Sequence, residues 1–312
     1  MELFQLGEKK LVEKLCEILG NKVEDAACIK LNSDFLVIST DMIYEQTHVP
    51  EGMSYYQIGK LIVTVNFSDL AAMAAKPLAF LLAIGCSRNM KEENFLEIIR
   101  GVKDSCQKYG ARFVGGDTKE AEKLTLTGTA IGLTERPVFR YKARPGDKIV
   151  VTGTLGDAAL GLELLKKKRN KLKDYPYIKK RTFEPEPRVK EALLLGEIAS
   201  SMTDISDSLA ISLYDISKES NVGFEIFSEK IPISEEALEL AKIIGVSPLE
   251  KALYGGGDYE LLATIPKDKI DKLPLNEGFT IIGNVIEQRK IFLVSNGKKR
   301  ILEKMGYEHF KR

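Results

Sequence analysis

Hydrophobic and polar residues alternate along this chain in two patterns, one typical of helices and one typical of strands. In residues 7–20, Leu11, Leu15, Ile18 and Leu19 recur every three or four positions, which predicts an amphipathic helix. Short apolar runs predict strands, and longer apolar or amphipathic stretches predict further helices. In the first half of the chain we expect strands over residues 35–40, 78–86, 111–114 and 124–133, and helices over residues 55–75 and from about 95 to 110.

A segment of mixed charge separates this first half from a second one. Residues 135–147 contain Pro137, Pro145 and Gly146 among charged side chains, which is a composition typical of a linker. We therefore predict two domains, residues 1–136 and residues 137–312. Ser206 or Asp207 is placed to cap a helix that follows them. In the second domain we expect a strand over residues 148–152 and helices over residues 157–168, 189–200 and 207–217.

Composition excludes several classes of protein. A chain of 312 residues with 44% hydrophobic content can build one large core or two domains. The net charge of +1 suggests binding neither to nucleic acid nor to a membrane surface. No apolar run approaches about 18 residues, and residues 1–10 lack a signal region, so we expect a cytoplasmic protein without a membrane span. The four cysteines form no Cys-x-x-Cys pair and suggest buried thiols rather than a zinc site.

Six aspartates follow or interrupt apolar segments and carry most of the chemical information. A carboxylate at the mouth of an apolar strand is costly unless something pairs with it. A single such residue would be a cap or a turn. Six of them, with almost no His, Cys or Lys between, indicate an oxygen-ligand cage for hard cations, most often Mg²⁺ with substrate phosphates. The six are Asp25, Asp41, Asp69, Asp117, Asp204 and Asp207.

Four weaker signals accompany the aspartates. The segment 115–118, Gly-Gly-Asp-Thr, suits either a close approach of backbone to phosphate or a tight turn, with nothing to separate the two. Residues 255–260, Gly-Gly-Gly-Asp-Tyr-Glu, favour a ligand-lining loop over a flexible one. His48 alone is a weak signal, since a lone histidine is more often packed or exposed. Nine Lys and Arg in residues 166–181 favour a solvated helix end over a nucleic-acid site.

The common nucleotide-binding motifs are absent. Gly59-Lys60 lacks the upstream glycine of a phosphate-binding loop and is followed by Leu61. Neither histidine precedes Arg-Asp, which excludes a protein-kinase catalytic loop. The glycines of residues 153–161 have the wrong spacing for a dinucleotide fingerprint. A nucleotide enzyme with this sequence therefore belongs to a less common class.

Taken in order along the chain, these motifs resemble the thiamine-monophosphate kinases of the PurM-like superfamily, which is related to AIR synthetase. The resemblance covers nearly the whole chain, and as an ordered set the motifs are highly specific. They are residues 7–8 (Gly-Glu), 24–27 (Glu-Asp-Ala-Ala), 39–42 (Ser-Thr-Asp-Met), 65–73 (Val-Asn-Phe-Ser-Asp-Leu-Ala-Ala-Met), 115–118, 151–158 (Val-Thr-Gly-Thr-Leu-Gly-Asp-Ala), 204–207 (Asp-Ile-Ser-Asp) and 255–260.

The resemblance implies a fold and an activity. The fold would be α/β (α+β), PurM-like and two-domain, with an N-terminal mixed or antiparallel sheet that has helices on one face, and a C-terminal α/β domain. The activity would be transfer of the ATP γ-phosphoryl group to thiamine monophosphate, which gives thiamine diphosphate and ADP. Several Mg²⁺ ions would assist, and two copies would pair through their N-terminal halves, with ATP across the cleft.

The resemblance also implies roles for individual residues. His48 would contact the acceptor, and Tyr307 or Phe310 would cover the thiamine ring by stacking on its cationic thiazolium. The family usually has Glu where this chain has Gly257, so Asp258 would take over or Gly257 would contribute backbone only. Gly116, Arg140 and Ser206 would contact the nucleotide. The metal ligands would be Asp25, Ser39, Thr40, Asp41, Asp69, Asp117, Asp204 and Asp207.

Electrostatics favours direct transfer to an acceptor that is already anionic. At ~4 Å and an effective dielectric constant of ~20, each pair of unit charges on the two phosphates repels by about 4 kcal/mol. Mg²⁺ offsets this repulsion, and no general base or covalent intermediate is needed.

Two alternatives stay open from the sequence alone: a purine-type ATPase that forms an amidine, and a non-catalytic sensor of Mg²⁺-nucleotide. The purine-synthesis members carry an Asp-Gly-Val-Gly-Thr-Lys segment that this chain lacks. Selenophosphate synthetases carry a reactive Cys in a Gly-rich segment, whereas Cys16 lies in a predicted amphipathic helix.

Overall fold

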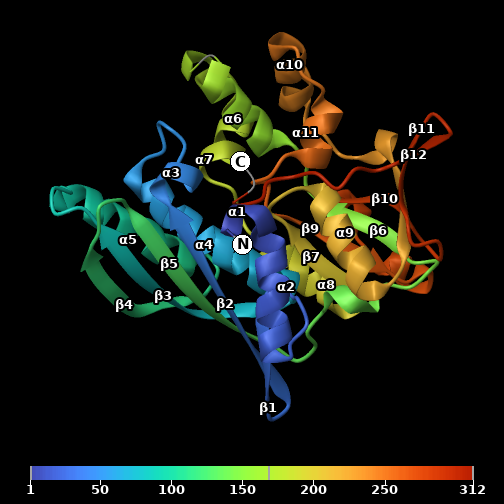
Figure 1. Ribbon diagram of the computed structural model, residues 1–312, viewed down its shortest axis with the longest axis horizontal. Helices are drawn as coiled ribbons and strands as arrows, with labels where there is room; N and C mark the ends of the chain where they lie inside the picture. The colour runs from blue at the N-terminus through green and yellow to red at the C-terminus, as the bar shows by residue number, and fades with distance from the viewer. Residues whose placement is uncertain (1, 168, 311–312) are drawn as a thin grey trace.

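The computed structural model describes residues 2–167 and 169–310 and has two sheets, one from each half of the chain (Figure 1). The first sheet has the strand order β1-β2-β5-β3-β4 and is mixed, because β3 and β4 run parallel while the other neighbours run antiparallel. Its strands are β1 (Ala27–Leu31), β2 (Asp34–Tyr44), β3 (Lys76–Cys86), β4 (Arg112–Glu120) and β5 (Thr125–Thr134).

The second sheet has the strand order β12-β11-β8-β10-β6-β9-β7. It is largely antiparallel, and β8 and β11 form a parallel pair within it. Its strands are β6 (Lys148–Thr152), β7 (Ser201–Ile205), β8 (Gly223–Phe227), β9 (Glu260–Ile265), β10 (Phe279–Ile286), β11 (Ile291–Ser295) and β12 (Lys298–Ile301). The predicted domain boundary after residue 136 falls between β5 and β6.

Helices cover one face of the first sheet and surround the second. In the first half, α4 and α5 pack on the sheet and α3 follows β2. In the second half, α6, α7, α10 and α11 lie on one side, and α8 and α9 complete the packing (Figure 1). The helices are α1 (Leu3–Leu6), α2 (Glu8–Leu19), α3 (Glu45–His48), α4 (Tyr55–Ala72), α5 (Glu92–Lys108), α6 (Asp157–Lys167), α7 (Pro176–Phe183), α8 (Val189–Ile198), α9 (Leu209–Ser220), α10 (Glu235–Ile244) and α11 (Pro248–Tyr254), with short 3₁₀ turns η1 (Arg140–Lys142), η2 (Arg169–Asp174), η3 (Ser228–Lys230), η4 (Lys267–Lys272) and η5 (Leu275–Glu277). Lys168, at the expected end of α6, lies outside the described residues.

Helix α4 joins the two halves. It begins with a capping box in which Ser54 accepts from the Gln57 N–H, and most of its residues are buried. One side packs on the first sheet, and another packs on α8, β7 and β9 of the second half. Gly59 lets α5 approach closely, since a Cβ there would lie 2.1 Å from the carbonyl oxygen of Ile98. A helix buried on several sides at the junction of two cores fixes the position of any polar side chain that it carries.

Two expectations about the strands were wrong. The predicted strand over residues 35–40 continues to Tyr44, so Asp41 lies within β2 rather than at its end. The segment 115–118 is not a turn but part of β4, which pairs with β3 as far as Glu120. Val114 is an extra residue in that pairing, and Gly115 there has φ +141°, a backbone conformation that favours glycine. A Cβ on Gly116 would lie 1.6 Å from the Leu82 carbonyl oxygen.

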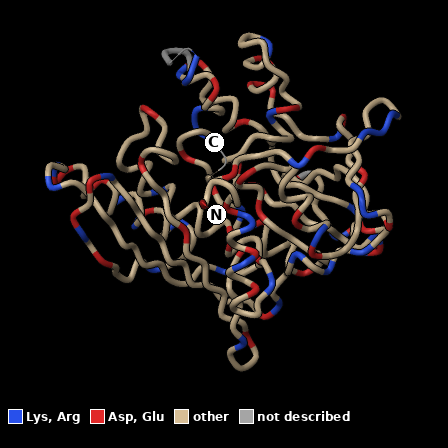
Figure 2. Tube along the Cα trace, in the orientation of Figure 1, with Lys and Arg blue, Asp and Glu red and all other residues tan. Residues whose placement is uncertain are grey.

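The length of the helices and the distribution of charge describe the outside of the molecule. Within residues 2–167 and 169–310, no helix has both the length and the apolar character needed to cross a membrane. Lys and Arg residues are spread over the outside, for example on the β11–β12 hairpin, and are not gathered on one face (Figure 2).

Candidate active site

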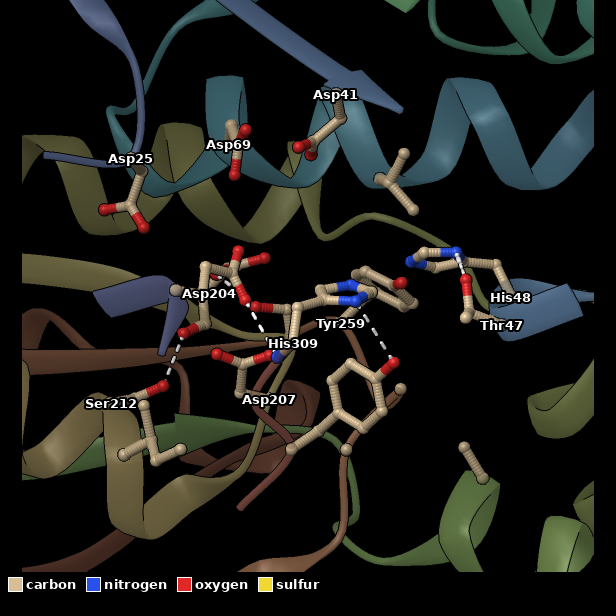
Figure 3. Close-up of a pocket in the computed structure, with 18 of the residues that line it drawn as sticks. Asp25, Asp41, Thr47, His48, Asp69, Asp204, Asp207, Ser212, Tyr259 and His309 are labelled. Atoms are coloured by element: carbon tan, nitrogen blue, oxygen red, sulfur yellow. Dashed lines mark hydrogen bonds between the residues drawn. The ribbon is translucent and has the colours of Figure 1, made fainter. Parts of the chain in front are cut away.

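A cavity of about 1000 Å³ lies between the two halves of the chain. Figure 3 shows its carboxylates in two groups that face each other: Asp25, Asp41 and Asp69 from the first half, and Asp204 and Asp207 from the second. Five of the six aspartates that the sequence singled out therefore meet in one place, although they are separated by as many as 182 residues along the chain (207 − 25).

The first group comes from three different elements. Asp69 projects from the last turns of α4, where Ser39 Oγ donates a hydrogen bond to its Oδ2 at 2.5 Å. Asp41 lies on β2, two residues beyond Ser39, and its backbone N–H donates to Asn66 Oδ1 at 3.0 Å. Asp25 precedes β1. Because α4 and β2 are core elements, they hold these carboxylates in fixed positions.

The second group lies at the end of β7 and in the loop after it. Asp204 is buried, and Ser68 Oγ of α4 donates to its Oδ2 at 2.6 Å. The next helix, α9, is capped by Ser208, which accepts from the Ile211 N–H, and not by Ser206 or Asp207 as we expected. Ser206 and Asp207 therefore lie before the helix, where both line the cavity.

The carboxylates of Asp25, Asp69 and Asp204 approach one another closely enough to share an ion. One oxygen from each lies within 4.8 Å of the others. Burial raises the pKa of Asp204 to about 7, and burial beside Asp41 and Asp204 raises the pKa of Asp69 well above its usual value. Burial also raises the pKa of Asp41. Crowded carboxylates with raised pKa values and oxygen donors only are a donor set that fits Mg²⁺.

Arg140 is the cation closest to this group. Its guanidinium forms an ion pair with Asp25, and its Nε lies 3.0 Å from Asp25 Oδ2 and 3.1 Å from Thr203 Oγ1. Thr203 in turn donates to Asp25 Oδ1 at 2.8 Å. The backbone N–H of Arg140 donates to Glu24, whose pKa burial raises to about 7. Arg140 thus balances the charge of Asp25 at one end of the cavity.

The other end of the cavity is aromatic. The rings of His48 and His309 lie 5.3 Å apart between centroids, and Tyr307 meets His309 edge to face at 4.9 Å. His48 Nδ1 accepts from the Tyr44 backbone N–H at 3.2 Å, so a neutral His48 ring carries its proton on Nε2. Phe310 also lines the cavity.

The glycine-rich loop closes the cavity between these two ends. The Gly257 N–H donates to the Ser206 carbonyl at 2.7 Å, and a Cβ on Gly256 would lie 2.7 Å from the carbonyl oxygens of Ser206 and Asp207. Gly257 has φ +92°, and Tyr259 has φ +52°, which is strained for a residue with a side chain. Because Gly257 carries no side chain, it offers the cavity only its backbone.

Five of the residues predicted for the site do not line this cavity within one chain. Asp258 is fully buried, and its two oxygens accept from the N–H groups of Gly156 and Ala158 at the start of α6. Its carboxylate therefore holds the start of that helix and does not face the cavity, so the expectation that Asp258 would take over the role of the family's Glu was wrong. Thr40 and Asp117 have their side chains on the opposite face of the first sheet, and Gly116 lies in β4. Ser39 is also outside the lining, but it reaches the site through its hydrogen bond to Asp69.

Several lining residues escaped the analysis of the sequence. Lys9 and Asp215 form an ion pair at 3.3 Å in the cavity wall, and Thr203 donates a hydrogen bond to Asp25. None of these three lies in a pattern that sets it apart from ordinary helix or strand residues. His309 had a usable signal, because it is one of only two histidines in the chain.

Comparisons with known proteins show which family and which solved structures the chain is similar to. The family model for the N-terminal domain of AIR synthase related proteins matches residues 23–134, and that for the C-terminal domain matches residues 144–296. The thiamine-monophosphate kinase of Methanospirillum hungatei is 42% identical over 97% of this chain and 99% of its own, and that of Pyrococcus horikoshii is 35% identical over 98% and 97%. The solved structure "AaThiL complexed with AMPPCP and TMP" is 32% identical, has a TM-score of 0.91 and covers 99% of both chains.

Proposed function

The chain belongs to the AIR synthase related family and, within it, to the thiamine-monophosphate kinases, and from this we propose that it transfers the γ-phosphoryl group of ATP directly to thiamine monophosphate with the help of several Mg²⁺ ions. Membership confirms the predicted PurM-like, two-domain fold and the predicted class of enzyme. It also favours a thiamine-monophosphate kinase over the purine-type ATPase and the sensor that the sequence alone left open.

One observation supports the metal-assisted mechanism above all others: carboxylates from both halves of the chain converge, with oxygens of Asp25, Asp69 and Asp204 within 4.8 Å of one another. Asp41 and Asp207 extend this set along the cavity. When bound there, Mg²⁺ would neutralise phosphate oxygens and stabilise the charge that develops during transfer. The protein's own part is to hold five carboxylates where two polyanionic substrates must meet.

The remaining lining residues divide between the two substrates in this proposal. Arg140 and Ser206 contact the nucleotide near the acidic end. At the aromatic end, His48 donates from Nε2 to the acceptor, and Tyr307 or Phe310 stacks on the thiazolium ring. Gly257 contributes its backbone. The acceptor is a phosphate oxygen that is already anionic, so positioning and charge balance replace a general base.

We include a second copy of the chain in the proposal, paired through the uncovered face of the first sheet. That face carries exposed apolar side chains, including Leu78, Leu81 and Val114. Asp117 shares this face with Met42, because register aligns Met42, Thr127, Ala83 and Asp117 in one row. A twin packed on this face would bring Thr40, Gly116 and Asp117 to a site that they do not reach within one chain.

The test is release of ADP from Mg-ATP with thiamine monophosphate, beside thiamine and a control without acceptor, with thiamine diphosphate identified by mass. We expect ADP release and thiamine diphosphate only when thiamine monophosphate is the acceptor, and neither with thiamine nor without an acceptor. ATP hydrolysis that does not depend on this acceptor would contradict the proposal. Incubation with γ-labelled ATP and acid quenching should leave no label on the protein, because the transfer is direct. Stable label would point to a phosphoenzyme instead.

A further inference from the structure

Helix α2 lies over the cavity without being packed into either core. None of its residues is buried, and Leu15, Ile18 and Leu19 are more than half exposed. An isolated helix of about 12 residues is marginally stable in water, so tertiary contacts must hold this one in place. Its first turn, Glu8 and Lys9, lines the cavity.

Polar contacts to the site and to the C-terminal segment provide that hold. The Glu8 N–H donates to the His309 carbonyl at 3.3 Å, and the His309 N–H donates to Glu8 Oε2 at 3.2 Å. Glu13 pairs with Lys218 of α9. Lys9 makes the contact that matters most here, because its Nζ lies 3.4 Å from Asp207 and 3.3 Å from Asp215.

Lys9 therefore bridges two carboxylates, and one of them is an aspartate to which we assign a cation. The pair is partly shielded from water, with 26% of the Lys9 side chain and 34% of the Asp207 side chain exposed. The local charge explains the arrangement: Asp207, in the loop after β7, and Asp215, on α9, both lie within 3.4 Å of the Lys9 ammonium group, which lowers the repulsion between the two carboxylates.

From this arrangement we propose that Lys9 is a resident counter-ion of the acidic cavity, and that a divalent cation arriving at Asp207 displaces it. The inference rests on the proposed function, since it requires Asp207 to be a cation ligand. A metal ion would draw the Asp207 oxygens to itself and would repel the ammonium group. Lys9 would keep Asp215, which also binds Lys304 at 3.6 Å, so the first turn of α2 would lose one of the two ion pairs of Lys9 and would keep the contacts of Glu8 with His309. Loading of the metal thereby loosens the helix that covers the site.

The test combines calorimetric titration with MgCl₂, without nucleotide, and hydrogen exchange of residues 8–19. The variants are Lys9→Met and, as a matched control, Lys14→Met, which removes the same charge from an exposed position on the same helix. We expect Lys9→Met to bind Mg²⁺ about three- to tenfold more tightly than the wild type, or about 0.6 to 1.4 kcal/mol, and Lys14→Met to stay within about twofold. In the wild type, MgCl₂ should speed exchange in residues 8–19. In Lys9→Met, exchange should be fast from the start and unchanged by MgCl₂.

An Asp207→Asn variant separates failure of this inference from failure of the proposed function. If Asp207→Asn weakens Mg²⁺ binding but Lys9→Met does not strengthen it relative to Lys14→Met, the counter-ion role is wrong and the metal site stands. If the wild type and Asp207→Asn bind Mg²⁺ equally, Asp207 is not a ligand and both proposals fail at that residue. Circular dichroism of each variant shows whether it is folded before either measurement is interpreted.

Discussion

Asp69 has both a structural and a chemical setting, because it lies on the core helix α4 and its side chain is close to other carboxylates. Asp69→Asn should lower the rate of ADP formation by at least about 100-fold, since it removes a charged ligand from the predicted metal site. Folding should not suffer, because an amide oxygen can still accept the hydrogen bond from Ser39 and the change relieves repulsion from Asp41 and Asp204.

Thermal unfolding measured without metal checks the second part of this prediction. The melting temperature of Asp69→Asn should equal or exceed that of the wild type, and Asp268→Asn, at an exposed position on η4, should leave both rate and stability unchanged. Unfolding of Asp69→Asn would show instead that this aspartate holds the fold together.

Asp204 gives the metal-free protein a distinctive dependence on pH. Its pKa is raised to about 7 by burial and by Asp25, whereas an unfolded Asp has a pKa of about 3.9. Between about pH 4 and pH 7, the folded chain holds a proton that the unfolded chain has lost. The resulting stabilisation is complete below pH 4 and is lost as the pH rises through 7.

We therefore expect the melting temperature in EDTA to fall between about pH 4.5 and 7, and to fall less in Asp204→Asn, which cannot titrate. Glu24 has a pKa raised to about 7 as well and should leave a residual slope in the variant. Identical, level profiles for the wild type and the variant would contradict the raised pKa of Asp204.

Single residues explain both what the sequence predicted and what it did not. The six aspartates could be recognised in the sequence because a carboxylate beside an apolar segment is costly unless it has a partner, and five of them meet in the cavity. Asp258 was predicted to contact the acceptor, but its carboxylate accepts from the N–H groups at the start of α6, which have no partner within the helix. The role of Lys9 could not be predicted, because lysines are common on amphipathic helices and only the fold brings this one close to Asp207.

At the scale of elements, the N-terminal cap of α9 fixes the end of the loop that carries Asp204 and Asp207. Ser208 accepts from the Ile211 N–H at 3.1 Å and donates to the Met305 carbonyl at 2.8 Å. Ser208→Ala should therefore cost about 1–2 kcal/mol in the free energy of unfolding, measured with urea. Ser247 caps α11 in the same way, since its side chain accepts from the Glu250 N–H. Ser247→Ala should lower the free energy of unfolding by less than Ser208→Ala does. Equal losses would show that the bond to Met305 contributes little.

Element boundaries were predictable only where local patterns decide them. The predicted helices over residues 55–75 and 95–110 are α4 and α5, because their apolar residues are the ones that the fold buries, and α4 also begins with a capping box at Ser54. The turn that the sequence left open at residues 115–118 is not formed, because glycine there is not a turn residue. It is needed there for a bulge and for close contact with Leu82, which depend on the pairing of β4 with β3. Such pairing is not visible in a local pattern.

At the scale of the whole molecule, the uncovered face of the first sheet predicts the state of assembly. Leu81 lies on that face and is 36% exposed. Leu81→Lys should convert a dimer to a monomer in light scattering after size-exclusion chromatography, because a charge in an apolar interface is left without a partner. Activity should fall with it if Asp117 acts in the partner's site. A wild type that is monomeric at the same concentration, or a dimer that tolerates Leu81→Lys, would contradict pairing through this face.

The division of carboxylates between the two halves has a consequence for how the molecule unfolds. Asp69 of the first half and Asp204 of the second repel each other in the metal-free chain, which weakens the thermodynamic coupling of the two cores. A cation held by both would be lost when either half unfolds, so each half would then depend on the other. In calorimetry, the ratio of calorimetric to van't Hoff enthalpy should accordingly exceed one without Mg²⁺ and approach one with it. The same ion that serves the chemistry would set the cooperativity of the fold.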